Sequence, residues 1–406
     1  METAAAVPHP ARGLRMVIAA NAVPGQGGQG LNLHHMAEGL CEAFALSVFC
    51  RAPIGIAPAH VVPGSRTEAI IGATPLLRRA RGLQAYLSST HFDHYVAAHL
   101  PAAELFQGVT GQCAFSLRAA RARRMRTVAD VVTVHVDEFR AQVARECAAF
   151  GVLPPLNGAM RRRILDEYAG ADLVRVMSER ARRTFLDRGF PEDRIAVVAP
   201  YIDLGEFPAA DFGASKFRIS FVGLIEPWKG FHYLITAFNA LRLPDSELLL
   251  WGGPGSRPVS NFLRGAIARN PAISIRPVEV RRIGYGEVYG KSSVFVHPSL
   301  TDGFGYTVLE AMASGLPVIV ADGVGAAELV VDGYNGYVVP GGQSGPIAER
   351  LEHLYHNPEL VRRMGAAARR TAAELTLARF RQLYVPRLRA LCAGAAADGG
   401  NARHAD

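Results

Sequence analysis

Short apolar runs alternate with longer segments of helical period along most of this chain. Runs at 14–21, 46–50, 217–222, 247–251, 294–296 and 316–321 predict buried strands. Segments at 31–44, 112–124, 231–241 and 306–314 have the spacing of amphipathic helices. Strands and helices that alternate in this way are typical of a parallel sheet covered by helices on both faces. We therefore predict an α/β fold.

The length of 406 residues is more than one compact α/β domain needs, so two domains are expected. We place an N-terminal Rossmann-like domain at 13–205 and a C-terminal Rossmann-like domain at 206–375, with a linker over 200–208. The end segments 1–12 and 393–406 are rich in small or polar residues, and we expect both to be disordered.

Composition excludes several classes of function. The net charge is +8, but 41 of the 44 basic residues are Arg, and no aromatic residues alternate with them as in many nucleic-acid-binding proteins. The five cysteines are scattered without a metal-type pair, which favours a reducing compartment. No long apolar run predicts a membrane span or a secretory signal, so we expect a cytoplasmic protein.

Candidate chemistry is concentrated in the stretch 292–319, which reads strand, glycine-rich turn, helix, strand. Asp302 precedes the triplet Gly303, Phe304 and Gly305, and Glu310 follows eight residues after Asp302. Glycines let a backbone approach a ligand closely, and free amides at a helix start attract phosphate. Either carboxylate alone is more simply explained as a helix cap or a surface residue. Together with the turn, the two carboxylates favour a site for an extended ligand rich in hydroxyls.

This stretch resembles the Glu-x(7)-Glu signature of the retaining glycosyltransferases of family 4, which have the GT-B fold. Asp302 replaces the first Glu, and Glu310 matches the second. The resemblance implies two Rossmann-like domains that face each other across a cleft, with the acceptor mainly on the first and the nucleotide-sugar donor mainly on the second. It also implies that a helix at 376–392 crosses back onto the first domain.

Two glycine-containing loops extend the resemblance. Gly223 and Lys229 match the family's diphosphate-binding loop, although Leu224 stands where the family has Arg, which places the strength of phosphate binding in question. Gly27 and Gly28 match a pair that lies against the donor phosphates or the acceptor in the family. For each of these two glycines, a plain tight turn explains the residue equally well.

His135 matches a family residue that points toward the donor sugar from the opposite domain. We expect a strand over 126–135, with His135 at its carboxyl end. A single His at the end of a strand is also compatible with a structural, hydrogen-bonded role. The segment 164–207 matches the family as well, mostly as scaffold.

By resemblance, the chain is a retaining transferase that moves a sugar from a nucleotide sugar to an acceptor hydroxyl, with a glycan or lipid-linked acceptor and no nucleic acid. Lys229 and the amides of Phe304 and Gly305 would stabilise the leaving diphosphate, and Asp302 and His135 would position the sugar. Glu310 would bind the ribose. No metal or other cofactor is expected. The alternative is a non-catalytic nucleotide-sugar-binding protein or partner subunit.

Four smaller expectations concern local structure. Asn335 and Gly336 predict a hairpin-type turn, and Pro358 and Pro386 predict helix breaks. Glu328 matches a family residue whose simplest role is capping or fixing a loop. The arginines of the segment 112–124 form either a solvated face or a basic face suited to peripheral attachment at the inner membrane.

Overall fold

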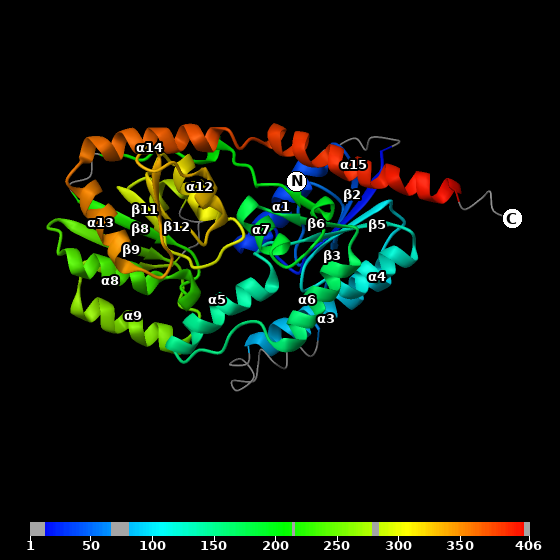
Figure 1. The fold of residues 1–406 in the computed structure, drawn as a ribbon, viewed down its shortest axis with the longest axis horizontal. Helices are drawn as coiled ribbons and strands as arrows, with labels where there is room; N and C mark the ends of the chain where they lie inside the picture. Colours follow the sequence, from blue (N-terminus) through cyan, green and yellow to red (C-terminus); the bar gives the residue numbers. More distant parts are fainter. Residues whose placement is uncertain (1–12, 66–80, 213–215, 278–283, 402–406) are drawn as a thin grey trace, which may run out of the picture.

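The computed structural model describes residues 13–65, 81–212, 216–277 and 284–401, and the chain forms two parallel sheets, each flanked by helices (Figure 1). The first sheet contains seven strands in the order β3-β2-β1-β4-β5-β6-β7. Its strands are β1 (Arg15–Ala19), β2 (Ala45–Cys50), β3 (Ala59–Val61), β4 (Leu105–Val109), β5 (Arg126–Asp130), β6 (Leu173–Val176) and β7 (Ile195–Val197).

The second sheet contains six strands in the order β10-β9-β8-β11-β12-β13. Its strands are β8 (Phe217–Val222), β9 (Ser246–Trp251), β10 (Ile273–Arg276), β11 (Val294–His297), β12 (Val318–Ala321) and β13 (Gly336–Val339). β8 and β11 are neighbours, with Val294 opposite Ile219. The loops that follow these two strands therefore begin at the same edge of the sheet, where open parallel sheets bind ligands.

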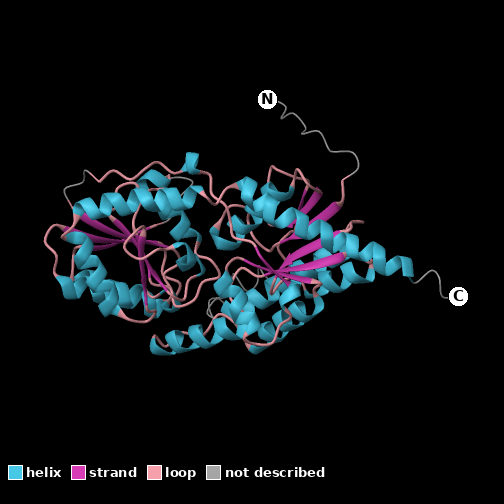
Figure 2. Ribbon diagram, turned by 45° about the horizontal axis from the view of Figure 1, so that its top comes forward, coloured by secondary structure: helices cyan, strands magenta, loops and turns pink. Residues whose placement is uncertain are grey.

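Helices cover both faces of each sheet (Figure 2), because the strands are almost continuously buried and need cover on two sides. The helices of the first half are α1 (Gly27–Leu40), α3 (Arg81–His99), α4 (Ala114–Ala122), α5 (Val136–Ala149), α6 (Gly158–Gly170) and α7 (Glu179–Leu186). Those of the second half are α8 (Phe231–Leu241), α9 (Arg257–Arg269), α11 (Tyr285–Val288), α12 (Tyr306–Ala313), α13 (Ser344–Tyr355) and α14 (Pro358–Ala373).

The last helix, α15 (Leu377–Asn401), crosses from the second half onto the first, as expected (Figure 1). Phe380 and Tyr384 are buried, and the Tyr384 hydroxyl donates to Gln107 Oε1 at 2.8 Å. A Cβ added to Gly39 of α1 would lie 2.2 Å from the Phe380 ring, so the two helices pack at the distance that glycine permits. The chain crosses between the two halves in two segments, one containing Ile202 and the other containing Leu375. The Ile202 amide donates to the Leu375 carbonyl, which joins the two crossing segments.

Two expectations about the C-terminal segment were wrong. Pro386 lies inside α15 and does not end the helix, because the side chains on either side of it pack against the first half. The helix also continues through part of the segment 393–406, to Asn401, where several alanines have a high helix propensity. Pro358 does begin a new helix, α14. Segment 1–12 and residues 402–406 lie outside the described residues.

Two local expectations in the sheets were also wrong. β5 ends at Asp130, so residues 131–135 form a loop and not the end of a strand. Asn335 and Gly336 do not form a hairpin, because β13 pairs in parallel with β12. The Asn335 side chain instead holds this turn through the Val331 amide and the Leu329 carbonyl.

The strands of the first sheet end at residue 197, and those of the second begin at residue 217. Between them lies η3 (Leu204–Glu206), a single 3-10 turn in which the Asp203 side chain accepts from the Gly205 amide. The proposed division at 205/206 falls in this turn. Among the described residues, no helix is long and apolar enough to span a bilayer.

Candidate functional site

Three side chains that follow the neighbouring strands β8 and β11 form one charged cluster. Lys229 ends η4 (Pro227–Lys229), and its Nζ lies 2.5 Å from Asp302 Oδ2. His297 is the last residue of β11, and its Nε2 lies 3.3 Å from the same oxygen. The side chains of Lys229 and Asp302 are 22% and 18% exposed, so both can be reached from solvent.

The electrostatic environment keeps this cluster as one cation and one anion. Burial alone would raise the pKa of the Asp302 carboxyl, but Lys229 and His297 hold that pKa well below its usual range. Burial lowers the pKa of His297, which is therefore a neutral imidazole near pH 7. The ring of His297 is nearly parallel to those of Phe221 and Phe295, with 10° and 18° between the ring planes and 6.3 and 6.1 Å between the ring centroids.

The glycine-rich turn brings the two halves of the chain into contact. A Cβ added to Gly303 would lie 2.5 Å from the carbonyl oxygen of Val132, which is in the loop after β5. The Ser178 hydroxyl, which also caps α7, donates to the Gly303 carbonyl at 2.7 Å. Gly305 has φ +94 at the start of α12, a conformation that favours glycine. The first amides of α12 have no acceptor within the helix, so they are suited to hold an anion.

Glu310 lies one turn into α12 and faces a cavity of about 480 Å³. The Tyr289 hydroxyl donates to Glu310 Oε2 at 2.6 Å. Burial raises the pKa of Glu310 to about 7, against the opposing effect of that hydrogen bond. The cavity lies between α1, the two crossing segments and the second half. Its polar lining residues are His34, His35, Glu38, Tyr201, Asp203, Glu206, Tyr285, Tyr306, Glu310 and Thr376.

The structure brings together most but not all of the residues expected from sequence. Lys229, Asp302 and the turn through Gly305 meet beside one another, and Gly223 follows β8 at the same edge of the sheet. Gly27 and Gly28 begin α1, and a Cβ added to either would touch nothing within 4 Å, so this loop faces open space. Its position is fixed by Gln112, whose Nε2 donates to Gln29 Oε1 at 2.9 Å.

His135 is not part of the charged cluster. It caps α5, where its Nδ1 accepts from the Asp137 amide at 3.2 Å, and its ring packs against Tyr168 and Phe185. Burial lowers the pKa of His135 to about 4, so the ring is neutral. The structural alternative for this residue therefore describes its surroundings better than a direct role toward a sugar. The loop that precedes His135, not its side chain, contacts Gly303.

Two residues of the site were not predicted from the sequence. They are His297, which is hydrogen-bonded to Asp302, and Tyr289, which is hydrogen-bonded to Glu310. A polar residue at the end of the buried run 294–296 was the available indication for His297. Nothing in the local sequence separates Tyr289 from other helix residues. Glu328 has the capping role expected of it, because its Oε2 accepts from the Glu179 amide at 2.9 Å, across the two halves of the chain.

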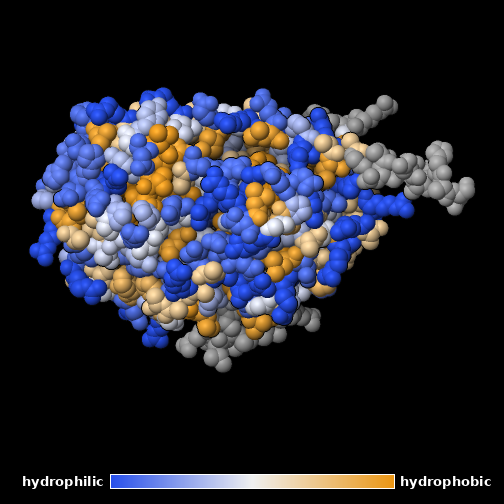
Figure 3. All heavy atoms as spheres, viewed as in Figure 1, coloured by the Kyte–Doolittle hydropathy of each residue, from blue (hydrophilic) through white to orange (hydrophobic). Residues whose placement is uncertain are grey.

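Two further features named from the sequence are Leu224 and the basic face of α4. Leu224 is 52% exposed, and its apolar side chain cannot pair with a phosphate as the expected Arg would. The basic face on α4 is partly engaged, since Arg121 donates to the Gly170 carbonyl at 2.6 Å and Arg118 donates to the Ala114 carbonyl at 3.1 Å. On the face of the molecule in Figure 3, hydrophobic residues are scattered among hydrophilic ones.

Two parallel sheets of this kind, with the last helix crossing back onto the first half, define the GT-B fold. Solved structures with this architecture include Anabaena Alr3699/HepE in complex with UDP-glucose, at 18% identity and a TM-score of 0.68, covering 93% of this chain and 100% of that one. Sucrose-phosphate synthase from Thermosynechococcus elongatus gives a TM-score of 0.72 at 19% identity, covering 94% of this chain and 100% of that one. At these identities the likeness establishes the fold.

Residues 207–371 match the family described as "Glycosyl transferases group 1". A D-inositol 3-phosphate glycosyltransferase of Mycobacterium sp. (strain KMS) is 31% identical over 250 residues, which are 57% of this chain and 56% of that protein. The protein of the same name from Nocardia farcinica is 29% identical over 258 residues, covering 59% of this chain and 56% of that one. The matches thus span a little over half the length of these relatives.

Proposed function

We propose that this chain is a retaining glycosyltransferase that moves a sugar from a nucleotide sugar to an acceptor hydroxyl. The observation that carries the proposal is the half-open ion pair of Lys229 and Asp302 beside the amino end of α12, with Glu310 one turn further along the same helix. A cation and helix amides suit a diphosphate, and carboxylates suit the hydroxyls on either side of it. The match of residues 207–371 to the glycosyl transferases group 1 family supports this interpretation.

Each group has a proposed task in the reaction. Lys229 and the amides of Phe304 and Gly305 stabilise the negative charge that develops on the departing diphosphate. Asp302 accepts hydrogen bonds from sugar hydroxyls. Glu310 accepts hydrogen bonds from the ribose, inside the cavity that it lines. Gly27, Gly28 and Gly223 let the backbone of two loops approach the phosphates closely.

In the proposed reaction, the bond between the anomeric carbon and the diphosphate oxygen breaks, and a bond from that carbon to the acceptor oxygen forms on the same face. The hydroxyl proton of the acceptor leaves with the diphosphate or passes to solvent. We name no protein nucleophile. His135 acts only indirectly, by capping α5 and anchoring the loop that contacts Gly303.

A glycan or lipid-linked acceptor in surface polysaccharide or glycolipid synthesis is the proposed biological setting, with the protein in the cytoplasm or at the inner face of the membrane. Support comes from a structural relative, the lipopolysaccharide outer core galactosyltransferase WaaB, which has a TM-score of 0.61 and 14% identity. The relatives named for D-inositol 3-phosphate make a small phosphorylated acceptor the natural comparison in any assay.

The alternative is a protein that binds a nucleotide sugar without reacting it. Leu224 favours this alternative, because Lys229 then provides the site's cationic side chain without the usual Arg beside it. Slow hydrolysis of the donor in the absence of an acceptor separates the two functions, since a binder leaves the donor intact.

The test is a thermal-shift screen with UDP, GDP, ADP and their common sugar conjugates, followed by NMR of any sugar released. Binding to the native state raises the unfolding midpoint. We expect one nucleotide family to raise it, Glu310→Ala to abolish the shift, and Glu349→Ala, at an exposed position of α13, to leave it unchanged. A released sugar with an inverted configuration, or no shift with any nucleotide, would contradict the proposal.

A further inference from the structure

The carboxylate of Asp302 uses its two oxygens differently. Both Lys229 and His297 contact Oδ2, at 2.5 and 3.3 Å. No hydrogen bond from a described residue reaches Oδ1, and the side chain is 18% exposed to solvent. One oxygen is therefore held by the protein, while the other is available to a ligand.

The two groups that hold Oδ2 differ in mobility. Lys229 reaches Asp302 through a flexible side chain that is 22% exposed, and a diphosphate at the start of α12 would compete for its ammonium group. His297 is 2% exposed, and its ring has the rings of Phe221 and Phe295 as near-parallel neighbours. When Lys229 turns toward the diphosphate, His297 remains as the partner of Oδ2.

Hydrogen-bond chemistry fixes the tautomer of His297. Lys229 keeps the pKa of the Asp302 carboxyl low, so this group is ionised and can only accept hydrogen bonds. The Nε2 atom of His297, which faces it, must therefore carry the proton. Nδ1 is then an acceptor, and Thr307 Oγ1 lies 3.4 Å away as its donor. Thr307 belongs to the first turn of α12. The chain Thr307–His297–Asp302 thus connects that helix to the carboxylate.

We propose that His297 is a positioning residue that keeps Asp302 Oδ1 directed toward the donor sugar, and so helps to select which sugar is accepted. This inference rests on the proposed glycosyltransferase function. The side chain of Asp302 is one methylene shorter than the Glu of the family signature. It therefore has fewer conformations in which its carboxylate can reach a sugar hydroxyl. The hydrogen bond from His297 to Oδ2 fixes the orientation of the carboxylate.

The proposal separates two kinds of binding energy. Binding of the nucleoside and diphosphate depends on Lys229, the backbone amides at the start of α12, and Glu310. Among the described contacts, His297 hydrogen-bonds instead to the side chains of Asp302 and Thr307. Discrimination among sugars depends on Asp302. Loss of His297 is therefore expected to change the preference for sugars without changing the affinity for the nucleoside diphosphate alone.

The experiment compares His297→Phe with His297→Gln. Phe keeps an aromatic ring at this buried position but cannot donate to Asp302, whereas the Gln amide nitrogen can reach a place close to that of Nε2. For the nucleotide family identified by the thermal-shift screen, affinities are measured for the nucleoside diphosphate and for three or four of its sugar conjugates. Thr307→Val tests the outer link of the chain, and His356→Phe, on the exposed end of α13, is the matched control.

We expect His297→Phe to bind the nucleoside diphosphate as wild type does and to lose about tenfold of the discrimination between sugars, which is one strong hydrogen bond to a charged group. His297→Gln should recover part of the loss. Nitrogen NMR of wild type should show the tautomer protonated at Nε2. The inference is overturned by unchanged discrimination in His297→Phe, by an equal loss of diphosphate affinity, or by the other tautomer. If wild type binds no nucleotide, the proposed function itself has failed.

Discussion

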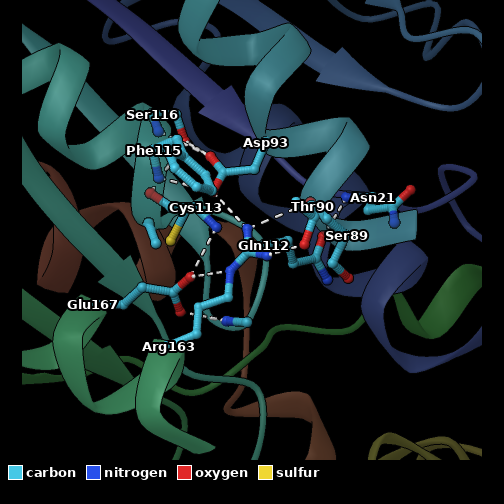
Figure 4. A network of polar contacts seen from close by, with 12 residues as sticks. Asn21, Ser89, Thr90, Asp93, Gln112, Cys113, Phe115, Ser116, Arg163 and Glu167 are labelled. Carbon is cyan, nitrogen blue, oxygen red and sulfur yellow. Dashed lines mark hydrogen bonds and ion pairs between the residues drawn. The ribbon is translucent and has the colours of Figure 1, made fainter. Parts of the chain in front are cut away.

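Two ionic clusters, one in each half of the molecule, differ in how completely protein hydrogen bonds satisfy their charged groups. In the first half, Arg163 lies between Asp93 and Glu167, and the three side chains are 7% exposed or less (Figure 4). In the second half, Lys229 and Asp302 are each about one-fifth exposed. The charges of the first cluster are thus buried, whereas those of the second are partly open to solvent.

The hydrogen bonds make the difference clear. Asp93 accepts from the amides of Phe115 and Ser116 at the start of α4, and from Arg163. Glu167 accepts from two further amides in the loop before α4 and from Arg163 (Figure 4). Every carboxylate oxygen in this cluster has a protein partner, so its role is to fix the loop between β4 and α4. Asp302 Oδ1 lacks such a partner among the described residues, so this carboxylate is suited to a ligand.

The largest expected effect breaks the closed cluster. Arg163→Leu leaves two buried carboxylates without their cation, and we expect the free energy of unfolding to fall by about 3–5 kcal/mol. Urea unfolding measures this loss. Arg162→Leu removes an exposed neighbour on the same helix and should change stability by no more than about 0.5 kcal/mol. Equal midpoints for the two variants would show that the closed cluster does not stabilise the fold.

A smaller effect concerns pH at the open site. Glu310 has a pKa of about 7, and its ionised form is the better acceptor for ribose hydroxyls. Donor affinity should therefore fall by up to about tenfold as pH falls from about 8 to about 6. A nucleotide sugar is the proper probe, because its diphosphate does not titrate in this range. Glu310→Gln should remove the dependence, and a wild-type affinity that is constant with pH would rule out this role.

The same pKa shift has the opposite sign for stability. Burial raises the pKa of Glu310 above its ordinary value of 4.5, so the folded state favours the protonated carboxyl. The stabilising contribution is fully present below pH 4.5 and is lost as pH rises through about 7. Donor binding and stability should thus respond to pH in opposite directions at this residue.

The smallest effect refines the comparison within the open cluster. Asp302→Asn releases Lys229 from its ion pair, so a nucleoside diphosphate without a sugar should bind as well as, or about two- to fivefold more tightly than, in wild type. The sugar conjugate should lose its advantage over the plain diphosphate. Competition binding measures the affinities for the plain nucleoside diphosphate and for its sugar conjugate. Weaker binding of the plain diphosphate would mean that Asp302 acts on the phosphates and not on the sugar.

Much of the fold could be predicted from the sequence because the signals are local. The apolar runs at 217–222 and 294–296 correspond to β8 and β11, and Gly305 ends the turn where helix α12 begins. The ion pair of Lys229 and Asp302 spans 73 residues. The two residues were predicted to share one site through two separate family motifs. Their contact depends on β8 and β11 being neighbours, which the local pattern does not specify.

The failures have physical causes too. His135 was expected at the end of a strand, but the strand stops at Asp130, and the extra loop residues allow the imidazole to cap α5. The contacts of individual arginines were not predicted from the sequence. In the structure, Arg194 donates to the last carbonyls of α6, and Arg381 donates to those of α1. Arginine side chains that stabilise helix ends in this way are found only through tertiary contacts.

The most direct test of the central claim is calorimetric titration of the preferred nucleotide sugar into wild type and Lys229→Met. Lys291→Met, which removes an exposed lysine paired with Glu287, is the matched control. If the open cluster is the donor site, Lys229→Met should bind about 10- to 100-fold more weakly, while the control binds as wild type does. Equal affinities for all three proteins would contradict the account and place the donor elsewhere.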